Sequence, residues 1–195
     1  ANARRLAENM PAAYNLLPSF DYFTYVQDPV VTFATSSDFL APWRARYGDE
    51  IHSSERLHTF IADQSRIPLP VSDPLDFPTS GNEVLLNNAE ILHNTMLDNW
   101  TPPTGVHLTE IAGWGEDTLA TINYREGKER ICIGIFPAPT CSDVIYRSKL
   151  EYSLKEVVEG DGTVVVPSAL WTATSTGVEK YWVNLRGYNN RPPAS

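Results

Sequence analysis

The feature that most constrains this sequence is a turn, Glu-Gly-Asp-Gly-Thr-Val, at residues 159–164. It follows a run typical of a β-strand, LEYSLKEVV at residues 150–158. It precedes the stretch PSAL at residues 167–170, where proline stands at a favoured first position of a helix. Glycines on both sides of Asp161 permit a tight backbone turn. The pattern therefore predicts a strand, a turn and a short helix, with one carboxylate at the end of the strand.

Asp161 has two interpretations at this stage. A carboxylate at the C-terminal edge of a sheet stands where α/β folds place their sites, and it can orient a histidine and stabilise the imidazolium there. An aspartate in a turn also commonly caps the helix that follows it. The spacing of the residues around Asp161 favours the capping role when it is considered alone, and other segments of the sequence bear on the choice.

The first part of the chain, residues 1–103, is rich in proline and aromatic residues and reads as helical and irregular. We expect short helices at 3–8, 38–47 and 54–63, and nothing there indicates an independent core. The clearest helix is predicted at 82–99. Its apolar stripe is formed by Leu85, Ala89, Leu92 and Met96, and Ser80 with Glu83 form a capping-box pattern at its start.

The second part, residues 104–195, is rich in strands and gives an α/β fold class. A strand is expected at 106–113, and a last strand at 180–186. Between them, the runs LATINY and RICIGIF flank the charged segment REGKE at 125–129, which suggests a β-hairpin that turns there.

Composition narrows the classes of function. With 195 residues the chain fits one domain, and a net charge of −9 argues against a nucleic-acid partner, because phosphate binding needs clustered Lys and Arg. No apolar run is long enough for a transmembrane segment. There is no phosphate-binding or dinucleotide-binding glycine motif, so we expect no organic cofactor.

Two cysteines, Cys132 and Cys141, leave two possibilities open. They can be buried thiols, or they can close a small disulfide loop, which would imply an oxidising, extracytoplasmic compartment. A zinc site would need further ligands nearby, and the histidines are scattered, so no metal is expected.

Three segments of the sequence, taken in their order along the chain, favour a catalytic role for Asp161 over the capping role. They are NMPAAYNLLPS at 9–19, VHLTEIAGWGEDTLATINY at 106–124 and GDGTVVVPSA at 160–169. Together they resemble the lecithin:cholesterol acyltransferase-like family of the α/β-hydrolase superfamily. The resemblance implies a serine esterase, lipase or acyltransferase that acts on acyl esters or lipids without a cofactor.

Carried over by position, the resemblance makes Asp161 the acid of a Ser–Asp–His triad. Gly160, Gly162 and Thr163 would shape its turn. Two departures are visible: Ala12 stands where the family often has serine, and Pro167 comes later than in the commonest family pattern.

The triad is incomplete in this sequence. No G-x-S-x-G nucleophile elbow is present, and all four histidines precede Asp161, whereas the superfamily order is Ser, Asp or Glu, then His. The four are His52, His58, His93 and His107. We therefore expect residues 1–195 to be part of a hydrolase domain, with a cap-like region at 1–103 and core strands with the acid turn at 104–195. The nucleophile and the histidine would lie outside the chain, in the remaining part of the domain or a companion chain, and the isolated chain should be inactive.

Aromatic residues near the start are candidates for a wall over an acyl chain. They are Tyr14, Phe20, Tyr22 and Phe23, for which ordinary core packing is the alternative. A different function also stays open, a non-catalytic binding or interaction domain derived from a hydrolase. If the chain is a piece of a parallel sheet, it should expose apolar edges and faces, because such sheets are normally covered on both sides. Compact folding of the isolated chain, with all strands in one closed core, would favour the binding domain instead.

Overall fold

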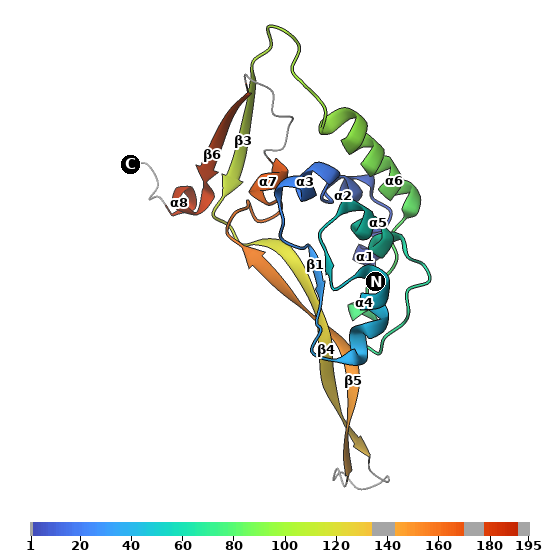
Figure 1. Cartoon of the computed structure of the whole chain (residues 1–195). Coiled ribbons are helices and arrows are strands. Elements are labelled where there is room, and N and C mark those ends of the chain that lie inside the picture. Colours follow the sequence, from blue (N-terminus) through green and yellow to red (C-terminus); the bar gives the residue numbers. More distant parts are fainter. Residues whose placement is uncertain (1, 134–142, 170–177, 191–195) are drawn as a thin grey trace.

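The computed structural model describes residues 2–133, 143–169 and 178–190 and has a mixed α/β architecture. Short helices gather on one side of a long, twisted β-hairpin (Figure 1). A separate pair of strands lies beyond the upper end of that hairpin, close to the C-terminal part of the chain (Figure 1). The α/β class expected from the sequence is therefore present.

The helical elements of the first part include the three segments that the sequence predicts, at 3–8, 38–47 and 54–63, and three that it does not, at 11–15, 20–25 and 74–76. They are α1 (Asn2–Ala7), α2 (Pro11–Asn15), α3 (Phe20–Tyr25), the 3-10 turn η1 (Asp38–Leu40), α4 (Ala41–Tyr47), α5 (Ser54–Ala62) and the 3-10 turn η2 (Pro74–Asp76). Ser19 caps α3 by accepting from the Tyr22 amide, and Ser53 caps α5 by accepting from the Arg56 amide. Hydroxyl caps therefore fix the starts of two of the helices.

The helix predicted at 82–99 is α6 (Glu83–Leu92), and it continues as a π-helical turn, η3 (His93–Leu97). Its cap is not the predicted Ser80–Glu83 box. The side chain of Asn82 accepts from the amides of Val84 and Leu85 instead. Ser80 donates its hydroxyl hydrogen to the carbonyl of Asp63, 2.6 Å away, and is therefore used in a tertiary contact.

The larger sheet has the strand order β2-β1-β4-β5. Its strands are β1 (Val31–Phe33), β2 (Glu50–Ile51), β4 (Thr118–Ile133) and β5 (Asp143–Val157). Strand β1 is parallel to β4, and the other pairs are antiparallel. Because β1 pairs with β4, residues 1–103 and 104–195 share one sheet.

The predicted hairpin turn at residues 125–129 is wrong, because β4 runs straight through it. That segment pairs with β5, and Lys128 lies opposite Ser148. Its charged side chains find partners across the ribbon: Glu129 accepts from Arg147 at 2.7 Å, and Glu151 lies 3.5 Å from Arg125. Cross-strand ion pairs stabilise an exposed ribbon, so a charged stretch can continue a strand where it appears to end one.

The smaller sheet consists of two parallel strands, β3 (Leu108–Trp114) and β6 (Val178–Asn184). The short helix α7 (Val166–Ala169) contacts β3, and α8 (Leu185–Asn189) follows β6 directly. Both strands run in the same direction, so their C-terminal ends lie side by side. The strands and the α7 position agree with the sequence-based prediction.

An aromatic core joins the first part of the chain to the hairpin. We call it the aromatic core; its buried members are Val31, Phe33, Leu40, Trp43, Tyr47, Ile51, Leu57, Phe60, Tyr124 and Leu150. Phe33 stacks on Tyr124 with ring centroids 5.8 Å apart, and the Trp43 indole donates to the carbonyl of Ile67 at 2.8 Å. This core was not predicted; eight of its ten members lie within residues 31–60, and the hairpin adds Tyr124 and Leu150.

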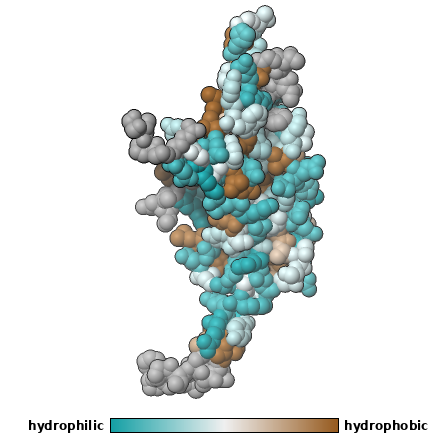
Figure 2. Space-filling model, turned by 90° about the vertical axis from the view of Figure 1, so that its left-hand side faces the viewer, coloured by the Kyte–Doolittle hydropathy of each residue, from teal (hydrophilic) through white to brown (hydrophobic). Residues whose placement is uncertain are grey.

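The β3–β6 pair has no comparable cover among the described residues. Ile111, Tyr181 and Trp182 are all exposed. Figure 2 faces the side that carries β6 and α8 and shows apolar patches among hydrophilic residues. Among the described residues, no helix is both long and apolar enough to cross a membrane.

Candidate functional site

The Asp161 turn is fastened to the segment that follows β3. The Gly115 amide donates to the carbonyl of Val158 at 2.8 Å, and the Glu116 amide donates to the carbonyl of Gly160 at 3.1 Å. A short parallel bridge joins Glu116 and Asp161. These bonds place the turn at the edge where β3 ends.

The side chain of Thr118 holds the Asp161 turn in place through two hydrogen bonds. Its side chain is fully buried, and its Oγ1 accepts from the Gly162 amide at 2.8 Å while donating to the Glu116 carbonyl at 2.9 Å. A Cβ on Gly160 would lie 2.3 Å from this Oγ1, and Gly162 has a φ of +91°. Both glycines of the turn are therefore required, one by close approach and one by its backbone conformation.

Asp161 itself is exposed, and its Oδ1 accepts from the amides of Thr163 and Val164, both at 2.8 Å. These two bonds lie within the turn, so Asp161 stabilises the turn itself and does not cap α7, which begins at Val166. Among the described residues, none donates a hydrogen bond to its Oδ2. The carboxylate is therefore held by one oxygen and presents the other outward.

The position of Asp161 is defined by the two parallel strands. A Cβ on Gly113, near the end of β3, would lie 3.2 Å from the Asp161 Cβ and 2.6 Å from Cδ1 of Leu185, which begins α8. Asp161 therefore lies close to the end of β3, where the side chain of Leu185, the residue that follows β6, also packs. This is the edge at which parallel sheets place polar functional groups.

A cavity of about 280 Å³, which we call the apolar cavity, lies beside the turn. Its turn-side wall consists of Thr163, Val164, Val165 and Ser168. The opposite walls come from the α2–α3 connection, β1, α5 and β4, and include Leu17, Tyr22, Val30, Phe60, Ile61 and Ala120. Its surface is dominated by aliphatic and aromatic groups, as in sites for apolar ligands.

A second cavity, of about 300 Å³, shares part of that wall and is called the mixed cavity here. The shared residues are Leu16, Leu17, Tyr22, Val164 and Ser168. Its own residues include Leu97, Trp100 and Ala169 together with the polar His93 and Asp98. The two cavities are therefore adjacent, and both are lined by Val164, three residues after Asp161.

The four aromatic candidates have separate positions. Tyr22 is buried and lines both cavities, and burial, followed by the charge of Asp28, raises its pKa. Tyr14 is buried elsewhere, and its hydroxyl donates to the Glu8 carbonyl at 2.8 Å. Phe20 is exposed, and Phe23 is half-buried and packs edge-on against Tyr22, with centroids 5.4 Å apart. Only Tyr22 of this group lies at the cavities beside the turn.

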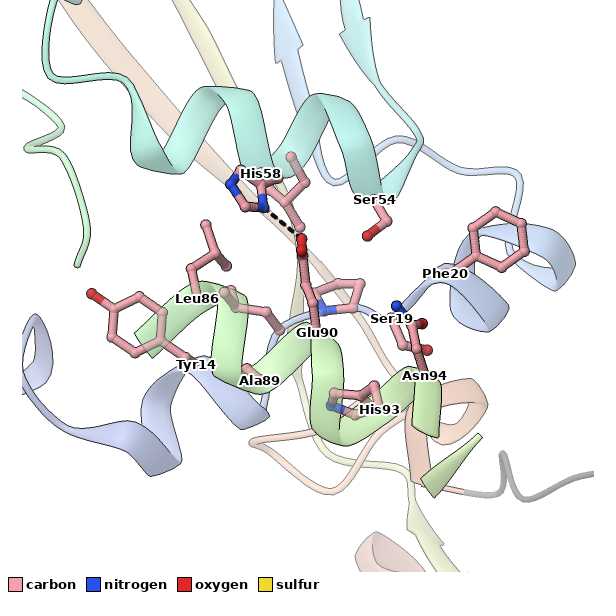
Figure 3. A pocket seen from close by; sticks show the side chains of 13 residues that line it. Tyr14, Ser19, Phe20, Ser54, His58, Leu86, Ala89, Glu90, His93 and Asn94 are labelled. Atoms are coloured by element: carbon pink, nitrogen blue, oxygen red, sulfur yellow. Dashed lines mark hydrogen bonds and ion pairs between the residues drawn. The ribbon is translucent and has the colours of Figure 1, made fainter. Parts of the chain in front are cut away.

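A pocket between α5 and α6 is lined by Ser54, His58 and Glu90, and also by Ser19 and His93 (Figure 3). His58 Nδ1 lies 2.7 Å from Glu90 Oε1. The second ring nitrogen of His58 points away from Ser54, which stands on the far side of the Glu90 carboxylate (Figure 3). A proton relay needs the base within hydrogen-bonding reach of its nucleophile, so these three residues do not form one.

His93 is held by two oxygen acceptors, as expected for a histidine with its hydrogen bonds satisfied. Nδ1 lies 3.2 Å from Asp98 Oδ1, and Nε2 lies 3.0 Å from the carbonyl of Asn15. Asp98 was not predicted as a site residue; it is buried and becomes a neighbour of His93 through the π-helical turn between them. No cluster of three or more metal-ligating side chains occurs in the described part of the chain.

Cys132 is disulfide-bonded, which excludes the free-thiol interpretation for this residue, while Cys141 lies outside the described residues. No protein-family model, no curated protein and no solved structure matches the chain.

Proposed function

We propose that this chain supplies the triad acid and the substrate-covering region of a serine esterase, lipase or acyltransferase with an α/β-hydrolase fold. The observation that carries the proposal is the Asp161 turn. It holds a carboxylate by one oxygen, leaves the other without a donor among the described residues, and stands where two parallel strands end. The resemblance of the turn and of the two earlier segments supplies the reaction class.

In the proposed mechanism, a serine outside these residues attacks the ester carbonyl, and a histidine takes its proton. Asp161 accepts a hydrogen bond from that histidine through Oδ2, holds the ring in the correct tautomer and stabilises the imidazolium. The backbone amides of Thr163 and Val164 keep the carboxylate in one orientation, since both bind Oδ1. No metal or organic cofactor takes part in this chemistry.

The exposed β3–β6 pair supports the proposal that further strands belong beside it. A parallel pair with Ile111 and Tyr181 exposed on one face is unusual, because parallel sheets are normally buried on both faces. The remaining part of the hydrolase domain, in the same or a companion chain, is the partner that would cover it.

The apolar cavity is the proposed acyl-chain site. It opens beside Val164 and Val165, next to the acid turn, and Tyr22 with Phe60 forms its aromatic wall. A volume of about 280 Å³ suits a short or medium acyl chain, because it lies at the lower end of ligand-site volumes. The disulfide at Cys132 favours an oxidising compartment for the enzyme.

The test is hydrolysis of p-nitrophenyl hexanoate by the full-length protein that contains this chain. Asp161→Asn should lower kcat by roughly 10⁴-fold, the loss seen when a serine protease loses its triad carboxylate. Asp117→Asn is the matched control, since Asp117 is an exposed carboxylate paired with Arg186 close to the same edge. It should leave kcat within a factor of about three.

Two results would contradict the assignment. One is full activity in the Asp161→Asn protein. The other is ester turnover by residues 1–195 alone, because these residues contain no serine and histidine in the required order.

The second candidate function is a non-catalytic binding domain. It is favoured by the hydrogen bonds of Oδ1, which give Asp161 a purely structural role in the turn. This candidate predicts no ester turnover by the full-length protein, while the apolar cavity would still bind hexanoate.

A further inference from the structure

The β4–β5 ribbon extends well beyond the helical part of the molecule (Figure 1). Close to the helices it is anchored by a bond from the Leu150 amide to the carbonyl of Pro70, 2.6 Å long. Farther out, β4 and β5 remain paired with each other as far as Ile133 and Asp143. The ribbon therefore presents its outer part to whatever surrounds the molecule.

The outer part of the ribbon carries exposed apolar side chains. We call residues 130–132 and 144–146 the ribbon end. Ile131 lies opposite Ile145 in the pairing, and the disulfide-bonded Cys132 lies opposite Val144. Ile145 is 47 % exposed and Tyr146 68 %, and Figure 2 shows apolar surface at the narrow lower end of the molecule. Apolar side chains gathered at an exposed place mark an interaction surface.

Basic side chains lie directly behind these apolar ones. Arg130 is paired with Tyr146, and Arg147 is the next residue along β5. Residues 128–149 contain two acidic residues and four basic ones, Lys128, Arg130, Arg147 and Lys149. This segment therefore has a net charge of +2, whereas the whole chain has a net charge of −9. The ribbon is a basic arm on an acidic protein, and its basic groups border an apolar end.

We propose that the ribbon end binds the surface of an anionic lipid bilayer. Val144 and Ile145 enter the boundary between the headgroups and the acyl chains. Tyr146 lies at the level of the headgroups, where amphipathic aromatic rings are enriched. Arg130 and Arg147 direct their guanidinium groups toward the anionic headgroups, while their aliphatic stems lie along the apolar side chains.

Charge and geometry both favour a bilayer as the partner. An anionic surface attracts the ribbon and repels the acidic remainder of the chain, so the molecule approaches with its ribbon end first. The unpaired backbone groups on the two edges of the ribbon limit the insertion to the headgroup region, because such groups are costly in hydrocarbon. Six residues are few for a stable protein interface, which takes about 20–30 residues on each side. The inference does not depend on the proposed function.

The test is co-sedimentation of the full-length protein with vesicles of ether-linked phosphatidylcholine and phosphatidylglycerol in equal parts. These lipids contain no carboxylic ester, so binding is measured separately from any hydrolysis. The protein should bind them about tenfold more tightly than vesicles of the ether-linked phosphatidylcholine alone, because four basic groups face the anionic surface. Salt at about 1 M should remove most of this difference by screening the charges.

Two variants alter the apolar and the basic part of the surface separately. Ile145→Ser should weaken binding to the anionic vesicles about tenfold, because an apolar side chain no longer leaves water. Arg130→Ala should weaken it about fivefold, the contribution of one basic residue at an anionic surface. Both side chains are exposed, so both variants should keep the fold.

Matched controls lie on the same strands, close to the helical part of the chain. Leu154→Ser alters a β5 side chain that is 52 % exposed, and Leu154 is paired with Ile122 beside β1. Arg125→Ala removes an exposed basic group from β4. Both controls should bind the anionic vesicles like the unaltered protein.

Four results would overturn the proposal. They are no binding to the anionic vesicles, equal binding to the neutral vesicles, equal binding by Ile145→Ser and Leu154→Ser, and a change of oligomeric state in Ile145→Ser. The last, measured by sedimentation equilibrium without lipid, would make the ribbon end a contact with a second copy of the chain.

Discussion

The aromatic core and the β3–β6 sheet differ in how completely they are covered. In the core, Phe33 and Trp43 are 2 % and 1 % exposed and are surrounded by other rings. In the sheet, Ile111 and Trp182 are 67 % and 58 % exposed, although both stand on regular strands. The aromatic core buries its apolar side chains within the described residues, whereas the β3–β6 sheet leaves apolar side chains exposed.

The same contrast holds for buried carboxylates. Asp63 in the first region accepts from Arg46, from the Ser65 amide and from the Tyr47 hydroxyl. Glu110 in β3 lies 3.3 Å from the Lys180 ammonium, yet neither of its oxygens has a hydrogen-bond partner. The candidate site lies between these two regions. The Asp161 turn is held by several hydrogen bonds, but the neighbouring β3–β6 pair has exposed apolar side chains.

The largest expected effect is a difference in the free energy of unfolding between substitutions of two tryptophans. Trp43→Ala should lower the free energy of unfolding by about 3–5 kcal/mol, because it leaves a cavity among packed rings. Trp182→Ala should change it by no more than about 0.5 kcal/mol in residues 1–195, because the side chain is exposed. Urea unfolding of both variants measures this, and equal losses would remove the contrast between the regions.

The next effect is the contribution of the buried Asp63 carboxylate to the pH dependence of stability. Burial raises the pKa of Asp63, but hydrogen bonds from Tyr47 and Ser65 and the Arg46 charge outweigh it, so the pKa is lowered below 3.8. A lowered pKa in the folded state gives stability that is present above the unfolded value and is lost as pH falls through the folded one. Acid unfolding below about pH 4 should therefore be less pH-dependent in Asp63→Asn.

At neutral pH, Asp63→Asn should cost about 1.5–3 kcal/mol, the range for hydrogen bonds to a charged group. Glu110→Gln should cost less, about 1 kcal/mol or below, because it loses no hydrogen bond and only the ion pair with Lys180, whose side chain is partly exposed. Urea titrations at pH 7 and pH 3.5 compare the two. A larger loss for Glu110→Gln than for Asp63→Asn would contradict the account.

A smaller effect is expected at the turn. Gly160→Ala should cost about 1–3 kcal/mol, since the new methyl group would meet the buried Thr118 hydroxyl. Gly105 also has a positive φ, of +86°, but nothing lies within 4 Å of a Cβ there, so Gly105→Ala tests backbone strain without a clash. Thermal unfolding should rank Gly160→Ala as the more harmful change.

The smallest effect distinguishes two substitutions of one residue. Asp161→Ala should cost about 0.5–1.5 kcal/mol because it removes the acceptor of two backbone amides. Asp161→Asn keeps an oxygen at that place and should be nearly neutral for stability. If both substitutions are equally destabilising, the turn does not depend on the Oδ1 acceptor.

Local patterns in the sequence were sufficient for much of the fold. The α6 helix, the strand before Gly113 and Pro167 at the start of α7 all depend on near neighbours, and each was predicted from them. The apolar stripe predicted along α6 is confirmed only in part, because Ala89 is buried but Met96 is 61 % exposed, and the buried leucine is Leu86. The segment around Gly127 was misjudged, because its strand character comes from β5, some twenty residues away.

The candidate site was predictable in part for the same reason. The turn at Asp161 is a local motif, so its place at a strand end could be anticipated. Asp98, the cavities and the partners of Thr118 depend on distant segments meeting, and no local pattern encodes that. Of the four aromatic candidates, only Tyr22 lines the two cavities beside the turn, because it is on the buried face of α3, whereas Tyr14 and Phe20 line the pocket between α5 and α6.

The most direct test of the central claim is an experimental structure of the full-length protein. It should place a histidine Nδ1 within about 2.6–3.2 Å of Asp161 Oδ2, the range of a catalytic hydrogen bond, with further strands beside β3 and β6. An Oδ2 that faces only water, beside a β3–β6 pair that is still uncovered, would contradict the assignment of Asp161 as a triad acid.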